Sequence, residues 1–281
     1  MTFRPVNPRN AVLEAVVLLH FNRQVFAPEA AAVRALHPRL AHDLPRLDEV
    51  QVATIAFGPG PPSPRLGAPV SMAAFKKDGT LETRVFLNGA GALLAVNFLL
   101  YTKWDELRPK AAGWICMVLA ALREIGGPDG IPPLQVTTVG HQMINVFIWN
   151  EADGGVTVRE LFAEKPSRLA DAAWNAAGQP WFAMHSTNQP LDAESRRVAL
   201  IDSLSFDLAE EPKIGWRLRL EQTLEARFAQ PIDFDDLVKA EQDGRLAPID
   251  ALLDRLHNET RSLMCSILRP DMLRRIGMEA P

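Results

Sequence analysis

Between Trp216 and Phe228, apolar and polar residues alternate for 13 residues, and this pattern constrains the fold more than any other segment. Arginine, glutamate and threonine occupy the odd positions, whereas the even positions are apolar except for Gln222. Successive side chains of a β-strand point to opposite faces of a sheet, so a period of two predicts a half-buried antiparallel strand. Such a strand needs neighbours, and runs of adjacent strands favour an antiparallel sheet.

Further segments extend the predicted sheet. Gln135–Trp149 is apolar on both faces, which predicts a central strand that is covered on both sides. An Asn-Gly pair at Asn88 and Gly89 favours positive φ angles and predicts a hairpin between strands at Thr83–Leu87 and Ala92–Leu100. The other strands that we predict are Val12–Phe21, Gln51–Phe57, Val70–Phe75, Trp181–Ser186 and Arg196–Asp207.

Two long helices are predicted from spacings of three and four residues between apolar side chains. The first helix begins at Thr102, where Thr102 and Asp105 fit a capping box, and it ends at the Gly-Gly pair that starts with Gly126. The second helix begins at Pro248 and ends at Pro270. Shorter helical segments are predicted at Pro28–His37 and Val158–Ala177.

Each half of the chain therefore consists of a run of strands followed by a long helix. The polar, glycine-containing stretch from Asn150 to Gly155 separates the halves near the middle of the chain. We predict an α+β fold of mostly antiparallel sheets with two long packed helices. Its two halves are residues 1–152 and 153–281, which can also form one continuous domain. The run Ile115–Leu122 is apolar all round, which predicts burial between layers or in a subunit interface.

The composition narrows the class of partner. The chain of 281 residues has 30 Lys and Arg against 34 Asp and Glu, a net charge of −4, and 7% aromatic residues. This balance argues against binding to nucleic acid or anionic lipid, because both need a basic surface. Glu221 and Glu225 interrupt the arginines of the alternating segment, which predicts a solvated face. No apolar run is long enough to span a bilayer, and the N-terminus lacks the apolar core of a signal peptide. We therefore expect a cytoplasmic protein without membrane association.

The sequence contains no complete catalytic or cofactor motif. It has no nucleophile elbow, P-loop, dinucleotide-binding glycine motif, zinc-protease helix or Cys-x-x-Cys pair. Cys116 and Cys265 lie in apolar helical patterns, which favours two buried thiols over a disulfide or a metal pair. We predict no cofactor.

Two clusters are candidates for a metal site. His37 and His42 are five residues apart beside a proline, which is more typical of a solvated loop than of metal ligands. Asp233, Asp235 and Asp236 lack the glycine and the distal glutamate of a calcium loop, and they fit the N-terminus of a helix. We predict no metal site.

Polar residues interrupt three apolar strand faces. Asn97 shares its predicted face with Tyr101, and Asn145 and Asp202 lie on apolar faces of their own strands. A polar group in such a position costs about 1–3 kcal/mol unless it is hydrogen-bonded. Asn97 and Asn145 either satisfy backbone groups at a bulge or sheet edge, or form a polar patch in a cleft with Tyr101 and His141 at its rim.

His257 lies on the flank of the apolar stripe of the last helix. It is either a partly buried histidine that packs between helices or a catalytic base. Asp254 and Arg261 lie near it at helical spacing and supply ordinary ion partners.

Four short segments carry a resemblance to a known family: Asn10–Val17, the run Asn97, Tyr101, Trp104 and Leu107, the strand Val139–Asn145, and Leu252–His257. They resemble a sporadically distributed, uncharacterised bacterial protein family. Gln142 and Met143 stand where that family has an Arg-Tyr pair. The resemblance implies an α+β protein of about this length without an established activity. A sporadic distribution implies mobile or accessory genes, such as defence-type systems.

Two functions follow as hypotheses. The first is a non-catalytic binding or assembly subunit that acts with a protein partner or associates with itself. The alternative is an enzyme with an unrecognised polar site around Asn97, Tyr101, His141 and Asn145. The candidate binding residues are Asn97, Tyr101, Trp104, His141, Asn145 and His257.

Overall fold

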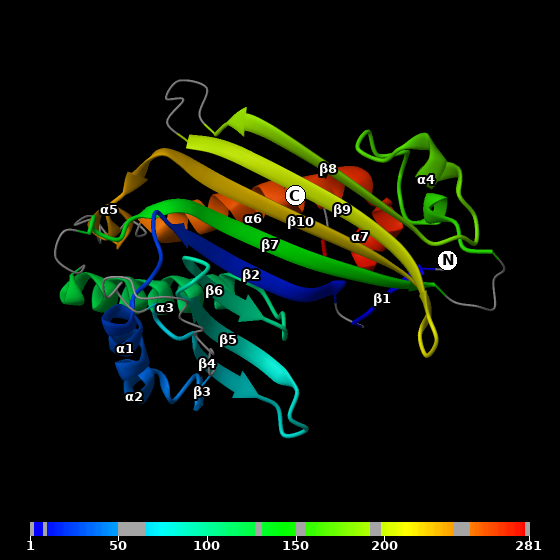
Figure 1. The fold of residues 1–281 in the computed structure, drawn as a ribbon. Coiled ribbons are helices and arrows are strands. Elements are labelled where there is room, and N and C mark those ends of the chain that lie inside the picture. Colours follow the sequence, from blue (N-terminus) through cyan, green and yellow to red (C-terminus); the bar gives the residue numbers. More distant parts are fainter. Residues whose placement is uncertain are drawn as a thin grey trace, which may run out of the picture.

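An antiparallel sheet forms the centre of the structure, a computed structural model, and helices cover one of its faces (Figure 1). The structure describes residues 3–7, 10–49, 66–126, 131–149, 155–191, 198–238 and 248–278. The predicted strand Gln51–Phe57 lies outside these residues. The predicted α+β class with an antiparallel sheet is confirmed.

The sheet has the strand order β3-β4-β5-β6-β2-β7-β10-β9-β8, and β1 pairs with β7 outside this path. Every ladder between these strands is antiparallel. The strands are β1 Phe3–Pro5, β2 Val12–Phe21, β3 Arg46–Glu49, β4 Val70–Phe75, β5 Leu81–Asn88, β6 Leu93–Phe98, β7 Val136–Trp149, β8 Trp181–Pro190, β9 Val198–Glu211 and β10 Gly215–Ile232.

The two longest helices are α3 and α6, and each begins after a run of strands. The helices are α1 Ala27–Ala35, α2 His37–Leu40, α3 Trp104–Ile125, α4 Asp171–Asn175, α5 Phe234–Val238, α6 Pro248–Ile267 and α7 Pro270–Arg275, with a 3-10 turn, η2, at Val158–Glu160. Pro270 begins α7 instead of ending α6. In the described part of the chain, no helix has the length and apolar character that crossing a bilayer requires.

The strands β7 and β10 match their predicted environments. β7 lies between β2 and β10 and is buried along most of its length, as expected of a central strand. In β10, Leu218, Leu220 and Leu224 are buried, while the odd positions from 217 to 225 remain half-exposed. The alternation in this segment thus predicted both the strand and its buried face.

The apolar core lies between the sheet and the helices. One cluster packs α3 and the first part of α6 against β2, β6 and the middle of β7. A second cluster packs the end of α6 and α7 against the rest of β7, β9 and β10. The side chains that point towards the helices are therefore the odd-numbered ones of β2 and β7 and the even-numbered ones of β6, β9 and β10.

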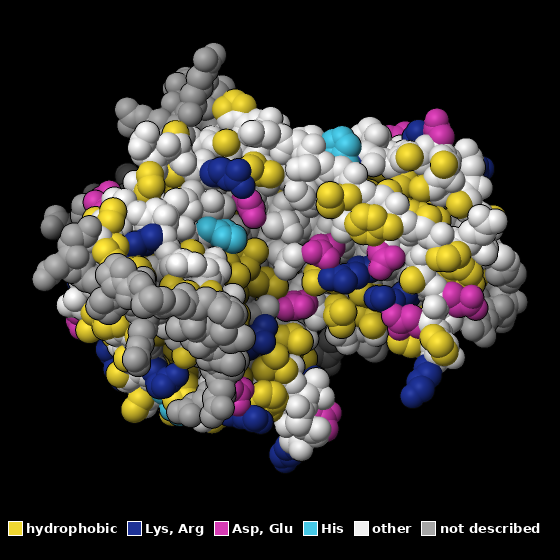
Figure 2. All heavy atoms as spheres, viewed as in Figure 1, with side chains coloured by type: hydrophobic (Ala, Val, Ile, Leu, Met, Phe, Trp, Pro, Cys, Tyr) yellow, Lys and Arg dark blue, Asp and Glu magenta, His cyan; other side chains and the backbone are white. Residues whose placement is uncertain are grey.

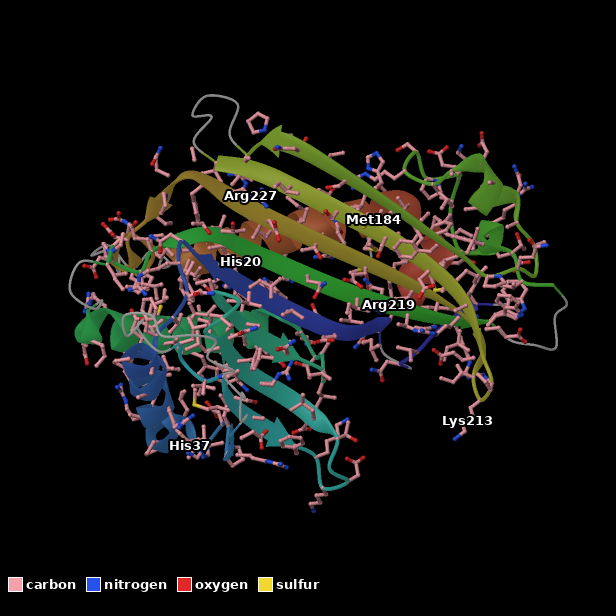
Figure 3. All side chains as sticks on the ribbon, viewed as in Figure 1. His20, His37, Met184, Lys213, Arg219 and Arg227 are labelled. Atoms are coloured by element: carbon pink, nitrogen blue, oxygen red, sulfur yellow. The ribbon has the colours of Figure 1, made fainter. Side chains whose placement is uncertain are left out.

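The opposite face of the sheet bears charged and apolar side chains side by side (Figures 2 and 3). Arg219 pairs with Glu221 at 2.6 Å, and Arg227 pairs with Glu225 at 3.3 Å. These residues of β10 are half-exposed or exposed, which agrees with the solvated face predicted from the sequence.

Strand β6 ends earlier than predicted. Its pairing with β5 stops at Phe98, and the backbone N–H groups of Leu99 and Leu100 both donate to the carbonyl of Glu82. The period of two therefore does not continue to Tyr101, and Asn97 does not share a face with it. The Asn-Gly hairpin is present, with Gly91 N–H donating to the Asn88 side chain.

Two helix predictions differ from the structure. Helix α3 begins at Trp104 after Lys103, and the Thr102 hydroxyl donates to the Glu106 carboxylate instead of capping a backbone N–H. The predicted helix Val158–Ala177 is a 3-10 turn and the short α4, because Pro166 and several small polar residues interrupt it.

Candidate functional site

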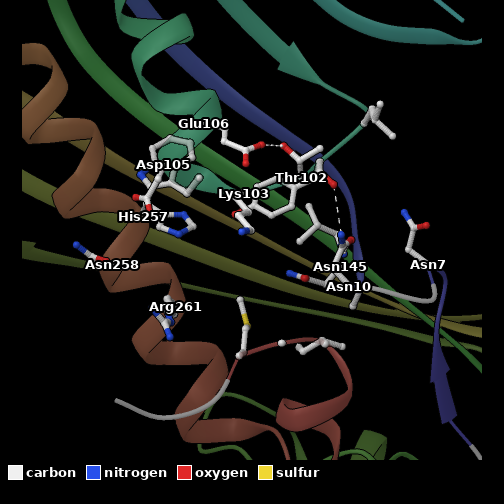
Figure 4. Close-up of a pocket in the computed structure, with 18 of the residues that line it drawn as sticks. Asn7, Asn10, Thr102, Lys103, Asp105, Glu106, Asn145, His257, Asn258 and Arg261 are labelled. Carbon is white, nitrogen blue, oxygen red and sulfur yellow. Dashed lines mark hydrogen bonds between the residues drawn. The ribbon is translucent and has the colours of Figure 1, made fainter.

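A pocket of about 930 Å³ lies where the start of α3 faces α6, and we call it the α3–α6 pocket (Figure 4). Residues 100–106 form one wall, and α6 contributes the opposite wall from Asp254 to Arg261. Asn145 of β7, residues 7 and 10–12 before and at the start of β2, and residues 276–278 after α7 complete the lining. The pocket thus joins segments from both ends and the middle of the chain.

A bulge in β2 brings the N-terminal segment to this pocket. Val12 pairs with Asn145 and Glu14 pairs with Ile144, which leaves Leu13 as the extra residue. The Asn10 side chain accepts a hydrogen bond from Val12 N–H at 3.1 Å and donates one to the Tyr101 carbonyl at 3.3 Å. Asn10 therefore ties the start of β2 to the segment that leads into α3.

Ion pairs hold α3 against α6 behind the pocket. The Arg108 guanidinium contacts the carboxylates of Asp250 at 3.0 Å and Asp254 at 2.6 Å. Asp250 is buried and Arg108 is largely buried, so loss of either partner would leave a buried charge unpaired, which is strongly unfavourable. They fix the distance between the two walls.

Asn145 is the most unusual residue of the pocket. It is 1% exposed, and neither its Nδ2 nor its Oδ1 has a hydrogen-bond partner within the described chain. The strand pairing explains its place, because Asn145 lies between Val12 of β2 and Leu220 of β10 on the face that points to the helices. Buried polar groups in folded proteins are almost always satisfied, so this side chain is the first candidate to bind a partner in the pocket.

Three rings pack together beside Asn145. The indole of Trp104 stacks on the imidazole of His257 with centroids 4.5 Å apart and planes at 14°. His141 meets Trp104 edge-on at 4.9 Å and His257 edge-on at 5.4 Å. His257 and Trp104 line the pocket, while the fully buried His141 lies behind them.

Both histidines are neutral at physiological pH. Burial lowers the pKa of His141 to about 3, and the charge of His257 adds to this effect. Burial is also the main cause that lowers the pKa of His257 to about 4, with the nearby Asp254 opposing the shift. The wall formed by these rings is therefore uncharged.

The hydrogen bonds of Thr260 show which ring nitrogen of His141 carries the proton. The Thr260 hydroxyl donates to the carbonyl of Leu256 at 3.1 Å and lies 3.3 Å from His141 Nδ1. A hydroxyl has one proton, so His141 Nδ1–H donates to Thr260 and Nε2 is the acceptor nitrogen. His141 Nε2, Trp104 Nε1 and His257 Nδ1 are buried without a partner among the described residues.

Tyr101 lies at the edge of the pocket. Burial raises the pKa of its hydroxyl to about 12, with a further contribution from the charge of Asp105, while Arg261 opposes the shift. The charged side chains of Lys103 and Asp105 are exposed at the rim, whereas Asp254 and Arg261 of α6 are half-buried in the lining.

The six predicted site residues thus separate into three groups. Tyr101, Trp104, Asn145 and His257 line the pocket, and His141 supports it from behind. Asn97 lies on the opposite face of the sheet, where its Nδ2 donates to Glu14 at 2.7 Å and its Oδ1 accepts from Arg84 at 3.4 Å. It is a satisfied structural residue.

Sequence reasoning missed other residues of this region. Asn10 stands out in the sequence only as the first residue of the segment Asn10–Val17, and Lys103 and residues 276–278 carry no signal, because their role depends on tertiary contacts. Asp202, the third polar interruption, is bonded to Gln222 at 3.1 Å and to Arg168 at 2.5 Å. Its contacts are therefore structural.

The other candidates for chemistry have ordinary surroundings. Across the described ranges, no three His, Cys, Asp or Glu side chains come together as metal ligands. Asp235 and Asp236 lie in the first turn of α5, as predicted for a helix N-terminus. Cys116 and Cys265 are free thiols that are half-buried, which differs from the full burial expected.

Comparison of the chain with models of known families and with curated proteins finds no match.

Proposed function

We propose that this protein is a non-catalytic binding subunit that assembles with a protein partner, as in the accessory or defence-type systems that the family resemblance implies. The observation that carries the proposal is the edge strand β8. Phe182 and Met184 of this ten-residue strand are 65% and 69% exposed. A long edge strand with exposed apolar side chains offers unpaired backbone groups to a strand of another chain.

The proposed two halves supply a second argument. The order β4-β5-β6-β2 matches the order β8-β9-β10-β7, and α3 follows β6 as α6 follows β10. This match supports two related halves that meet at the β2–β7 ladder. β3 pairs with the outer edge of β4, but no strand of the described chain pairs with the corresponding edge of β8. A partner strand would occupy the position that β3 has in the first half.

The pocket supports binding better than catalysis. A general base works best when its pKa is near the working pH, whereas the pKa values of His141 and His257 are about 3 and 4. The Thr260 hydroxyl donates its proton to a backbone carbonyl, so His141 is not poised to remove it.

The proposed family membership fits the same site. The four segments that carry the resemblance contribute Asn10, Tyr101, Trp104, Asn145 and His257 to one pocket. The four segments lie far apart in the sequence, and a common binding site would explain why all four carry the resemblance. This convergence supports a shared binding role.

Light scattering of the full chain, purified with whatever accompanies it, tests the assembly. We expect the wild type to form a complex and the double variant Phe182→Asp, Met184→Asp to be a monomer. Ile214→Asp is the matched control, because Ile214 is 46% exposed in the β9–β10 turn. Hydrogen exchange should show that the β8 amides on the edge away from β9 are protected only in the complex. A strictly monomeric wild type without a stoichiometric partner contradicts the proposal, and a homodimer that the double variant dissociates identifies a second copy as the partner.

A further inference from the structure

The inner wall of the α3–α6 pocket offers hydrogen bonds without charge. Asn145, Trp104 and His257 each have at least one buried side-chain nitrogen or oxygen without a partner in the described structure. The amide and the indole are neutral at every ordinary pH, and the imidazole is neutral because it is buried. Three neutral groups in one wall are therefore able to form further hydrogen bonds.

The charged groups of the pocket do not reach this wall as free ions. Arg108 occupies Asp254, Arg261 of the lining is engaged in an interaction of its own, and the Thr102 hydroxyl donates to Glu106 at 2.9 Å. Lys103 and Asp105 are exposed at the rim. An ion that entered the inner wall would lose its hydration without meeting an opposite charge that is free to pair with it, which is strongly unfavourable. The part of a ligand that reaches Asn145 is therefore uncharged.

The chemistry of Asn145 narrows the ligand further. A side-chain amide presents one carbonyl acceptor and one NH₂ donor next to each other. Both atoms are unpartnered, so their complement is a donor and an acceptor side by side. We propose that the α3–α6 pocket binds its ligand through an uncharged amide-type edge that pairs with Asn145.

Two kinds of ligand have such an amide-type edge. A small molecule supplies it as a primary amide or a lactam. An extended peptide supplies it as the N–H and C=O of one residue, which point to the same side of the chain. The pocket lies away from β8, on the face that carries the helices, so this proposal does not depend on the partner that β8 is proposed to bind.

Matched probes distinguish these chemistries in the full chain. Benzamide and benzoate have the same shape, but benzoate is charged and has only acceptors, so one of its oxygens would face the Asn145 carbonyl. Saturation-transfer NMR and calorimetric titration measure both, together with N-acetylglycine methylamide as the peptide probe. We expect benzamide or the peptide probe to bind at least about tenfold more tightly than benzoate, since one unmade buried hydrogen bond accounts for that factor. The tighter of the two probes identifies the source.

Variants assign the binding to Asn145. Asn145→Leu should weaken amide binding by about tenfold or more, because it removes both the donor and the acceptor. Asn97→Leu, the same substitution on the opposite face of the sheet, is the control that should retain binding. If the Asn145→Leu variant does not fold, the affinity of Asn145→Ala for the amide probes is compared with that of the wild type instead. Equal binding of benzamide and benzoate, no binding of either amide probe, or unchanged affinity in both Asn145 variants would overturn the proposal.

Discussion

Replacing Asn145 by leucine should stabilise the empty protein. Asn145 is 1% exposed, and its Nδ2 and Oδ1 lack partners among the residues described. Leaving a buried donor or acceptor unsatisfied costs about 1–3 kcal/mol, and leucine has nearly the same size without either atom. The free energy of unfolding should therefore rise by about 1–3 kcal/mol. In chains of 150–250 residues, each kcal/mol moves Tm by roughly 2–4 °C.

Asn97 provides a matched control for this variant. It is also a buried asparagine in the same sheet, at 7% exposure, but it bonds to Glu14 and Arg84 on the opposite face. Asn97→Leu removes a hydrogen bond to a carboxylate, which contributes about 1.5–3 kcal/mol. The two substitutions are identical in chemistry and should have opposite signs.

Urea unfolding followed by circular dichroism measures both effects. The midpoint should move up for Asn145→Leu and down for Asn97→Leu, while the slope with urea stays constant. If Asn145→Leu destabilises the protein as much as Asn97→Leu does, the Asn145 amide has a partner in the empty protein, such as a bound water. That result would refute the reasoning from its unpartnered atoms.

Three further predictions concern the same region. The unfolded chain protonates His141 and His257 near pH 6.5, whereas the folded protein does so near pH 3 and 4, so stability should fall as the pH falls below about 6.5. The loss approaches about 1.4 kcal/mol per pH unit for each histidine, and His257→Gln should remove its share of the slope in urea unfolding. Tyr101 is the only tyrosine, so its tyrosinate absorbance should rise near pH 12, and a midpoint near 10 would contradict its burial. Arg108→Ala should lower stability by about 3 kcal/mol because it leaves a buried carboxylate unpaired, whereas Arg123→Ala, in an exposed pair, should change thermal stability by less than about 1 kcal/mol.

The sequence predicted the strands better than the helix ends. Alternation from Trp216 to Phe228 and the two apolar faces of Gln135–Trp149 reflect burial directly, and both segments have the predicted environment. Helix starts depend on local hydrogen bonds that compete with one another. The Thr102 hydroxyl fits a cap in the sequence, but in the structure it donates to the Glu106 carboxylate and the helix begins only at Trp104.

The candidate site was only partly predictable for a related reason. A polar residue in an apolar strand can be found in a sequence, and Asn97, Asn145 and Asp202 are all buried as expected. Whether each has a partner depends on the neighbouring strands and on the face of the sheet. A two-residue change in where β6 ends separated Asn97 from Tyr101, and no local pattern marks that point.

Because Asn145 has no partner in the described structure, the stability of the protein should depend on whether a ligand occupies the α3–α6 pocket. A core residue whose hydrogen bonds are already made would not create this dependence. The pocket walls come from α3, α6, β7 and both ends of the chain, so a ligand that pairs with Asn145 would hold all of them together. A ligand at 100 times its Kd adds about 2.7 kcal/mol to stability, which is similar to the gain expected from Asn145→Leu. The variant should therefore match the stability of the filled wild type, while a tenfold weaker affinity would limit its own rise at the same ligand concentration to about 1.4 kcal/mol. Since one residue would account for both effects, a ligand-induced rise in stability that is undiminished in Asn145→Leu would place the binding energy elsewhere in the pocket.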